Sequence, residues 1–151
     1  MLDQLIIFGA TYLAWAPPIA LAIYFLSLPR AGKWRMGALS IVAFPVAFLI
    51  SRAAGFFYYS ERPFVRGAAA LIEHTPDNGF PSDHALLAFA IAFVAFAQNR
   101  LLGSVLFLIA VLISAARVLV GVHYPVDIAG SIFIAATATL VAASARYLIL
   151  K

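Results

Sequence analysis

The chain has 151 residues, of which 65% are hydrophobic and only 11% are charged. Its mean hydropathy of +1.03 excludes an ordinary soluble globular protein and indicates an integral membrane protein. The length fits a single domain, residues 1–151. Ten Lys and Arg stand against six Asp and Glu, but they form no basic stripe, which argues against nucleic-acid binding. Because the chain has no cysteine, disulfides and thiol chemistry are excluded as well.

Five apolar stretches follow one another at about residues 4–28, 36–58, 84–99, 101–121 and 126–148. A helix of about 20 residues crosses a hydrocarbon core of about 30 Å. The sequence therefore predicts an all-α fold, a polytopic membrane bundle of about five transmembrane helices. The third stretch is short, so its start is expected at the depth of the lipid headgroups.

Two further predictions concern the long connection and the first apolar stretch. The one long polar connection, residues 59–83, is expected to hold a short interfacial helix near Arg66–Glu73. The first apolar stretch lacks the basic flank and the small-residue cleavage site of a signal peptide, so it is expected to remain as a membrane anchor.

The charged residues divide between the two sides of a five-helix bundle. One side receives six bases and no acid: Arg30, Lys33, Arg35, Arg100, Arg146 and Lys151. The other side, or its edge, holds all six acids: Asp3, Glu61, Glu73, Asp77, Asp83 and Asp127. The positive-inside rule makes the first side cytoplasmic. The sequence thus predicts a multi-pass protein of the cell membrane, with its remaining arginines and its three histidines toward the extracytoplasmic face.

The arginines on that face are candidate ligands for an anion. Arg117 falls toward the end of a membrane helix, where a charge is costly unless it is paired or hydrated, so it marks a functional site by default. Snorkelling to the headgroups is the alternative for Arg117, and it applies more strongly to Arg62 and Arg66 in the connection. Several guanidinium groups that converge on one mouth suit a phosphate, whose oxygens accept paired hydrogen bonds.

Two histidines, His84 and His123, stand beside expected helix starts, where free N–H groups and the helix dipole attract anions. Ser82 can cap the third helix or donate to a phosphate oxygen, and capping is the commoner role of such a serine. Asp127 follows His123 by four residues and can fix which ring nitrogen is free. This arrangement is typical of an activated histidine nucleophile or base.

A metal site is the competing interpretation of these side chains. His84, His123 and Asp127 are all metal-binding residue types, but the neighbouring arginines would repel a divalent cation. No metal and no other cofactor is therefore expected.

Three motifs in order resemble the type 2 phosphatidic acid phosphatase superfamily, which shares its site with vanadium haloperoxidases. The family pattern runs Lys-x6-Arg-Pro, Pro-Ser-Gly-His and Ser-Arg-x5-His-x3-Asp. Within residues 52–131 this chain supplies Arg62-Pro63, Pro81-Ser82-Asp83-His84 and Arg117-x5-His123-x3-Asp127. The expected membrane location argues against the soluble haloperoxidase branch.

The chain departs from the family pattern at three positions. The expected lysine is Gly55, and the nearest base is Arg52, about one helical turn earlier. The expected serine is Ala116 and the expected glycine is Asp83. The Pro-Ser-Asp-His variant resembles the branch of the family that hydrolyses undecaprenyl diphosphate and is associated with bacitracin resistance.

The resemblance implies a metal-independent phosphatase that converts undecaprenyl diphosphate, or another polyprenyl diphosphate, to the monophosphate and so recycles the lipid carrier of cell-wall synthesis. It implies that His123 attacks phosphorus to form a phosphohistidine, that Asp127 orients His123, and that His84 serves as acid and then as base. The implied phosphate-binding residues are Arg62, Arg117, Ser82, Asp83, Arg52 and Arg66, with Arg52 or Arg66 replacing the absent lysine.

Two other functions stay open at this point. The same mechanism can serve a glycerolipid phosphatase that acts on phosphatidate or phosphatidylglycerol phosphate. A protein of another class, a non-enzymatic membrane protein that binds anionic lipids, can use the arginines as a headgroup clamp. The expected partners are a lipid phosphate and membrane lipids, and the sequence does not determine the oligomeric state.

Overall fold

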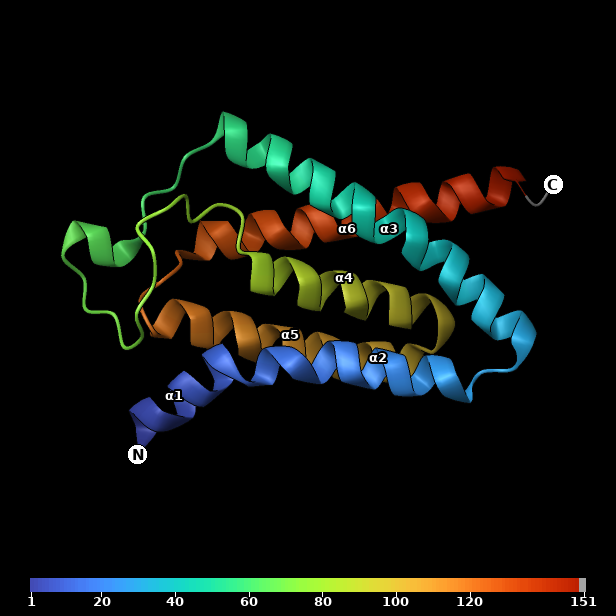
Figure 1. The fold of residues 1–151 in the computed structure, drawn as a ribbon, viewed down its shortest axis with the longest axis horizontal. Helices are drawn as coiled ribbons and strands as arrows, with labels where there is room; N and C mark the ends of the chain where they lie inside the picture. The colour runs from blue at the N-terminus through green and yellow to red at the C-terminus, as the bar shows by residue number, and fades with distance from the viewer. Residues whose placement is uncertain (150–151) are drawn as a thin grey trace.

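The computed structural model describes residues 1–149, with side chains through residue 145. All of its regular elements over that range are helices (Figure 1). The elements are α1 (Leu2–Thr11), the 3-10 helix η1 (Leu13–Trp15), α2 (Ala16–Ser27), α3 (Arg30–Phe57), the 3-10 helix η2 (Pro63–Arg66), α4 (Asp83–Gln98), α5 (Arg100–Leu119) and α6 (Pro125–Ile149). The described residues contain no β-strand, only an isolated bridge between Glu61 and Asn78. The predicted fold class is confirmed.

The helices make five passes along the long axis of the molecule. Four segments are long and apolar enough to cross a membrane: 2–27, 30–57, 100–119 and 125–145. The first of them is broken at η1, immediately before Pro17 and Pro18 start α2. The remaining pass, the short helix α4, has 16 residues and is about 24 Å long at 1.5 Å per residue. Its first turn therefore lies closer to the middle of the bundle than the ends of its neighbours.

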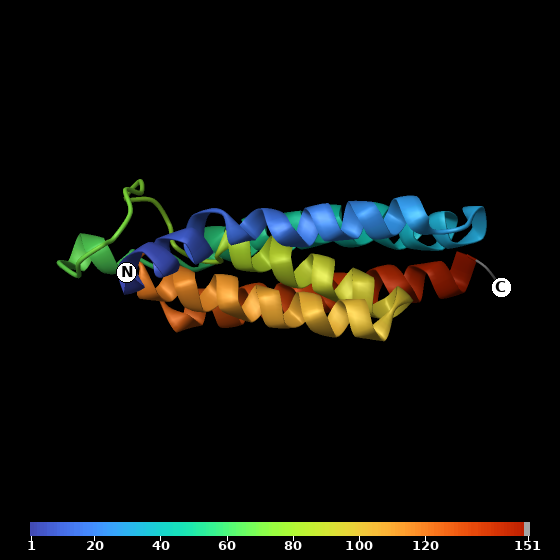
Figure 2. The same cartoon turned by 90° about the horizontal axis from the view of Figure 1, so that it is seen from below.

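Helix α4 is the centre of the bundle and packs against both α5 and α6 (Figures 1 and 2). Most of its apolar side chains are buried, and many of them are alanines that allow close approach of neighbouring helices. At its far end, a side chain at Gly103 of α5 would collide with the backbone of Phe96. The outer faces of the other helices expose large apolar side chains, as contact with lipid requires.

The two ends of the bundle differ in the segments that they carry. The N-terminus, the 58–82 connection and the turn between α5 and α6 lie at one end, and the turns before α3 and α5 lie at the other (Figures 1 and 2). This arrangement agrees with the grouping of charged segments that the sequence predicts. The side chain of Arg146 and the whole of Lys151, which belong to that prediction, lie outside the described part of the chain.

The prediction of an interfacial helix near Arg66–Glu73 is wrong. Helical structure in the connection is limited to η2, which ends at Gly67 with a left-handed φ of 88°, a conformation that favours glycine. The chain then extends, and the N–H of Leu71 donates to the carbonyl of Val120 at 3.0 Å. This backbone hydrogen bond attaches the connection to the end of α5, and the connection covers that end of the bundle.

Candidate active site

A polar cavity of about 300 Å³ opens beneath the 58–82 connection, between the ends of α3, α4 and α5. Its lining gathers charged residues and all three histidines: Arg52, Arg62, Arg117, Asp77, Asp83, His74, His84 and His123. The three separate sequence motifs therefore meet in one place. The fold accounts for this because α4 begins, and α5 ends, at the same end of the bundle.

Arg117 is the most unusual group in this cavity. Its side chain is on the last turn of α5 and the residue is only 3% exposed. Its one hydrogen bond is a long one, from Nη1 to the carbonyl of Ala10 at 3.5 Å, and Nε has no partner. Among the described side chains, no carboxylate lies within ion-pair distance of it. Since an unpaired buried charge is strongly unfavourable, this guanidinium is available for an anion.

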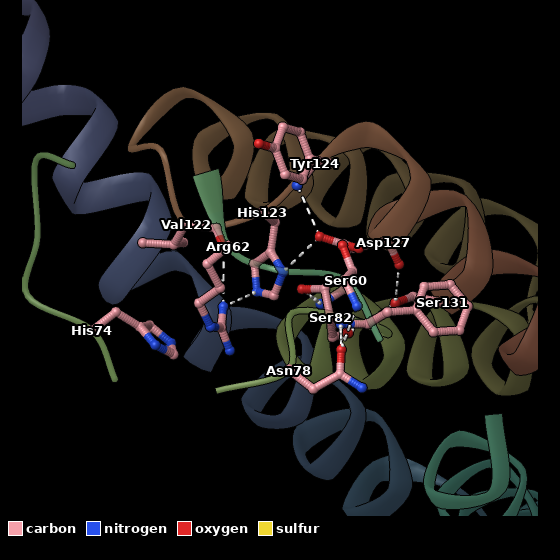
Figure 3. A network of polar contacts seen from close by, with 12 residues as sticks. Ser60, Arg62, His74, Asn78, Ser82, Val122, His123, Tyr124, Asp127 and Ser131 are labelled. Atoms are coloured by element: carbon pink, nitrogen blue, oxygen red, sulfur yellow. Dashed lines mark hydrogen bonds and ion pairs between the residues drawn. The ribbon is translucent and has the colours of Figure 1, made fainter. Parts of the chain in front are cut away.

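Arg62 is also buried, but it is held on three sides. Its Nε donates to Asp77 Oδ1 at 2.7 Å, and its Nη1 donates to the carbonyl of Val122 at 2.9 Å. The same Nη1 lies 3.4 Å from Nε2 of His123 (Figure 3). Burial would raise the pKa of the Asp77 carboxyl, but the hydrogen bond and the charge of Arg62, with smaller contributions from Thr75 and His74, together hold that pKa below its usual range. This role for Asp77 was not predicted from the sequence.

His123 lies in the turn between α5 and α6, with one ring nitrogen toward Asp127 and the other toward Arg62 (Figure 3). Its Nδ1 is 3.4 Å from Asp127 Oδ2, within ion-pair reach but without a well-aligned hydrogen bond. Its Nε2 faces Arg62, which can only donate. A neutral ring with its proton on Nδ1 therefore fits this environment, and its Nε2 lone pair then faces Nη1 of Arg62, which also lines the cavity.

Asp127 is fixed by the start of α6. Its Oδ2 accepts the N–H of Tyr124 at 2.8 Å, which is the carboxylate half of a helix capping box. The carboxylate is completely buried. Its place beside the imidazole thus follows from the first turn of the helix, as the four-residue spacing from His123 predicts.

The starts of α4 and α6 are tied together by Ser131, which sequence reasoning missed. Its hydroxyl lies 2.9 Å from the carbonyl of Ser82 and 2.8 Å from that of Asp127. Ser82 itself is buried, and its Oγ accepts the N–H of Ala85 at 3.5 Å as a helix cap. The Ser82 side chain does not line the cavity, whereas the next residues, Asp83 and His84, do. This link sets the position of His84 relative to His123.

Gly55, at the position of the expected lysine, lines the cavity and lies against the backbone of the connection. Asn78 forms four hydrogen bonds, accepting the N–H groups of Ser60 and Phe80 and donating to the carbonyls of Gly55 and Tyr58. A Cβ at Gly55 would lie 3.1 Å from the carbonyl oxygen of Phe80. A lysine at this position would therefore push against the connection. Sequence reasoning did not identify Asn78.

The two proposed substitutes for that lysine differ in location. Arg52 lines the cavity, and its Nη2 lies 2.9 Å from Asp83 Oδ1. Arg66 pairs with Glu61 at 2.8 Å and is not among the residues that line the cavity. The structure therefore brings Arg52 to the site and leaves Arg66 outside it.

His74 is a further cavity residue that the sequence motifs did not single out. It belongs to the connection, and its ring centroid lies 6.5 Å from that of His123. Its Nδ1 is 3.2 Å from the carbonyl of Thr75. Burial lowers the pKa of His74, and the charges of Arg62 and Arg117 lower it further.

The same electrostatics act on His123. Burial is the main cause that lowers the pKa of His123 below its ordinary value of 6.5. Arg62 and Arg117 add to this effect, while the contact with Asp127 opposes it. The imidazole is consequently neutral at physiological pH, the state in which a histidine is nucleophilic.

The metal-site alternative gains no support from the side-chain positions. Among the described residues, no three His, Cys, Asp or Glu side chains converge as metal ligands do. The cavity instead combines cationic side chains with a neutral imidazole, which suits an anionic substrate better than a cation.

Comparisons with known proteins identify the fold and the family. The PAP2 superfamily model matches residues 38–149. The chain is 33% identical to the bacitracin transport permease protein BcrC of Bacillus licheniformis over 85% of this chain and 64% of that protein. It is 34% identical to undecaprenyl-diphosphatase BcrC of Bacillus subtilis over 89% of this chain and 70% of that protein. The chain thus spans about two thirds of the length of these relatives.

Solved structures share the same fold. The crystal structure of Aquifex aeolicus LpxE superposes with a TM-score of 0.76 and 23% identity, covering 93% of this chain and 86% of that one. A PAP2 type phosphatidylglycerolphosphate phosphatase from Bacillus subtilis superposes with a TM-score of 0.68 and 20% identity, covering 98% of this chain and 78% of that one. At these identities the likeness establishes the fold alone.

The state of His123 can be tested by titration. Its folded pKa is below the unfolded value of 6.5, so the unfolded chain takes up a proton first as the pH falls. We therefore expect the free energy of unfolding to decrease below pH 6.5, and the His123 ring, followed by NMR in detergent, to titrate with a midpoint below 6.5. Inorganic phosphate should raise that midpoint, because an anion offsets the charges of Arg62 and Arg117. A midpoint at or above 6.5 in the ligand-free protein would contradict this electrostatic account.

Proposed function

The chain belongs to the PAP2 superfamily, and we propose from this membership and from the site that it is a membrane phosphatase that hydrolyses undecaprenyl diphosphate, or a similar polyprenyl diphosphate, to the monophosphate. This activity would return the lipid carrier of peptidoglycan synthesis to use. The observation that carries the proposal is the pair of buried arginines, Arg62 and Arg117, that line one cavity with a neutral His123. The names of the two Bacillus relatives support the choice of substrate and the link to bacitracin.

In the first step, Nε2 of His123 attacks the terminal phosphorus of the diphosphate. The Nε2–P bond forms as the P–O bond to the bridging oxygen breaks, and lipid monophosphate leaves. The ring becomes cationic as its lone pair is donated, and Asp127, 3.4 Å from Nδ1, stabilises that charge. The two atoms are expected to move closer in the transition state, since catalytic hydrogen bonds are often long in ligand-free structures.

His84 acts on the opposite side of the reaction. It lines the same cavity from the first turn of α4 and gives a proton to the leaving oxygen. In the second step it takes a proton from the water that attacks the phosphohistidine, and inorganic phosphate is released. One group thus serves as acid and then as base.

The arginines supply the charge that this reaction needs. Transition-state charge in phosphoryl transfer is spread over the equatorial oxygens, and preorganised cations stabilise it. Arg62 and Arg117 are buried at the cavity, so they require little rearrangement. Their presence fills the role that a divalent ion has in many other phosphatases, and we propose a metal-independent mechanism on that basis.

The other two functions are less well supported by the site. A glycerolipid phosphatase would use the same residues, but the likeness to the phosphatidylglycerolphosphate phosphatase is one of fold at 20% identity. A non-enzymatic lipid-binding protein would have no use for a neutral imidazole held between Asp127 and Arg62. We therefore favour the diphosphate hydrolase.

Replacement of the nucleophile is the first test. His123→Ala should lower phosphate release from undecaprenyl diphosphate by about 10³-fold or more, since the residual rate without a nucleophile comes from binding alone. Tyr124→Phe is the matched control: only the backbone N–H of Tyr124 contacts the site, so its activity should match the wild type. Purified proteins would be assayed with EDTA present, where the wild type should stay active.

Three results would count against the proposal. Phosphate release by His123→Ala at a rate near the wild type would remove the nucleophile, and loss of wild-type activity in EDTA would refute metal independence. Equal or faster turnover of phosphatidate in direct competition would assign the substrate to the glycerolipids.

We also propose that the cavity opens on the extracytoplasmic side of the cell membrane. The end that carries it holds acidic residues, whereas the opposite end carries Arg30, Lys33 and Arg35. Since the chain has no cysteine, single cysteines report sidedness directly. Glu73→Cys, in the exposed connection, should react with a membrane-impermeant thiol reagent in intact cells, and Ala31→Cys, at the start of α3, should react only after lysis. The reverse pattern would place the site in the cytoplasm.

A further inference from the structure

One ion pair stands between two cavities of opposite character. The polar cavity that contains His123 shares Arg52 and Asp83 with a second cavity of about 290 Å³ between α3 and α4. Apart from these two residues, the second cavity is lined only by apolar side chains: Phe44, Ala47, Phe48, Leu86, Leu87 and Ala90. The Arg52–Asp83 pair therefore marks the boundary between a phosphate site and an apolar groove.

The apolar groove runs from that boundary along two helices toward the middle of the bundle. On α4 its residues are spaced by three, four and seven positions from Asp83, which places them on one helix face. Helix α3 packs much more closely on α6 than on α4, so the space between α3 and α4 is not filled. Phe48 and Leu87, one from each wall, remain about half exposed. The groove is thus open to lipid and continuous with the polar cavity.

This arrangement corresponds to the order of groups in a lipid diphosphate. The terminal phosphate has to reach His123, in the cavity that Arg62 and Arg117 also line, and the hydrocarbon chain suits the apolar groove. The phosphate attached to the lipid must then lie at the boundary, beside Arg52. We propose that Arg52 binds this proximal phosphate and thereby selects lipid diphosphates over lipid monophosphates. The inference rests on the proposed phosphatase function and adds a residue that sets its substrate class.

The chemistry of the pair suits such a role. The guanidinium of Arg52 is permanently charged and can hold two phosphate oxygens at once. Its present partner, Asp83, is 2.9 Å away, and the two side chains are 54% and 72% exposed. Exposed pairs of this kind contribute little stability, so a phosphate with more negative charge can displace the carboxylate. The ring of Phe48, 5.5 Å from the guanidinium carbon, helps to keep Arg52 at the boundary.

A lipid monophosphate in the reactive position would not contact Arg52. Its only phosphate must be at His123 to react, which leaves Arg52 on Asp83 and places the first carbons of the lipid at the boundary. Gly55, where the family pattern has a lysine, provides no second cation for the proximal phosphate. Discrimination between the two classes of lipid should therefore depend on Arg52.

The test compares two soluble probes, farnesyl diphosphate and farnesyl monophosphate, with purified full-length protein. Arg52→Ala should lower kcat/KM for the diphosphate by about 10- to 100-fold, the range expected for a lost charged hydrogen-bonding pair, and leave kcat/KM for the monophosphate within about threefold. Arg66→Ala is the matched control: it breaks a similar exposed pair, at 2.8 Å with Glu61, outside the cavity. Its kcat/KM should not change for either probe. Arg52→Lys, which keeps the charge, should recover part of the preference.

Several outcomes would overturn the inference. An equal loss for both probes in Arg52→Ala would mean that Arg52 binds the terminal phosphate or supports the fold. No loss for either would make the pair with Asp83 a surface contact only, and failure of Arg52→Lys to recover any preference would exclude a role for the charge. These results are separable from failure of the proposed function, in which the wild type would hydrolyse neither probe.

Discussion

The buried guanidinium of Arg117, which has no carboxylate partner among the described side chains, is the constraint on which the site depends. A charge in this position is tolerated only if its surroundings compensate for it. The kinked first pass brings the carbonyl of Ala10 to Nη1 at 3.5 Å, and the cavity gives access to water and anions. The second buried arginine, Arg62, pairs with a single carboxylate, that of Asp77. Arg62 and Arg117 therefore leave an excess of positive charge among the side chains that line the inner part of the cavity, which suits the phosphate of the proposed substrate.

The same excess charge links binding to chemistry. Burial and the two arginines keep His123 neutral, so the proposed nucleophile would be in its reactive state before the substrate binds. In the proposed mechanism a bound phosphate neutralises the arginines, and Asp127 then becomes the main influence on the ring as positive charge develops there. Ser131 of α6 holds the start of α4 through its hydrogen bond to the carbonyl of Ser82, which fixes the position of His84 relative to His123. Binding, activation and positioning thus share one set of residues.

The sequence was most informative where local geometry decides the outcome. The run from Arg117 to Asp127 covers the end of one helix, a turn and the first turn of the next, so its spacing alone places His123 beside Asp127. The connection could not be predicted in this way. Its course depends on Gly67, on the hydrogen bond from Leu71 to α5 and on the contacts of Asn78 with α3, which join residues far apart in the chain. For that reason the expected interfacial helix was wrong, Arg66 lies outside the cavity, and the roles of Asp77 and His74 were missed.

The proposed mechanism requires that His123 becomes phosphorylated through Nε2, and rapid-quench labelling can detect this intermediate. Purified protein would be mixed in EDTA with undecaprenyl diphosphate that carries ³²P in its terminal phosphate, quenched within milliseconds and digested. The account predicts an acid-labile, base-stable label on the peptide that contains His123, formed in a burst before phosphate is released. A label on His84, or steady phosphate release with no labelled protein and no burst, would contradict it.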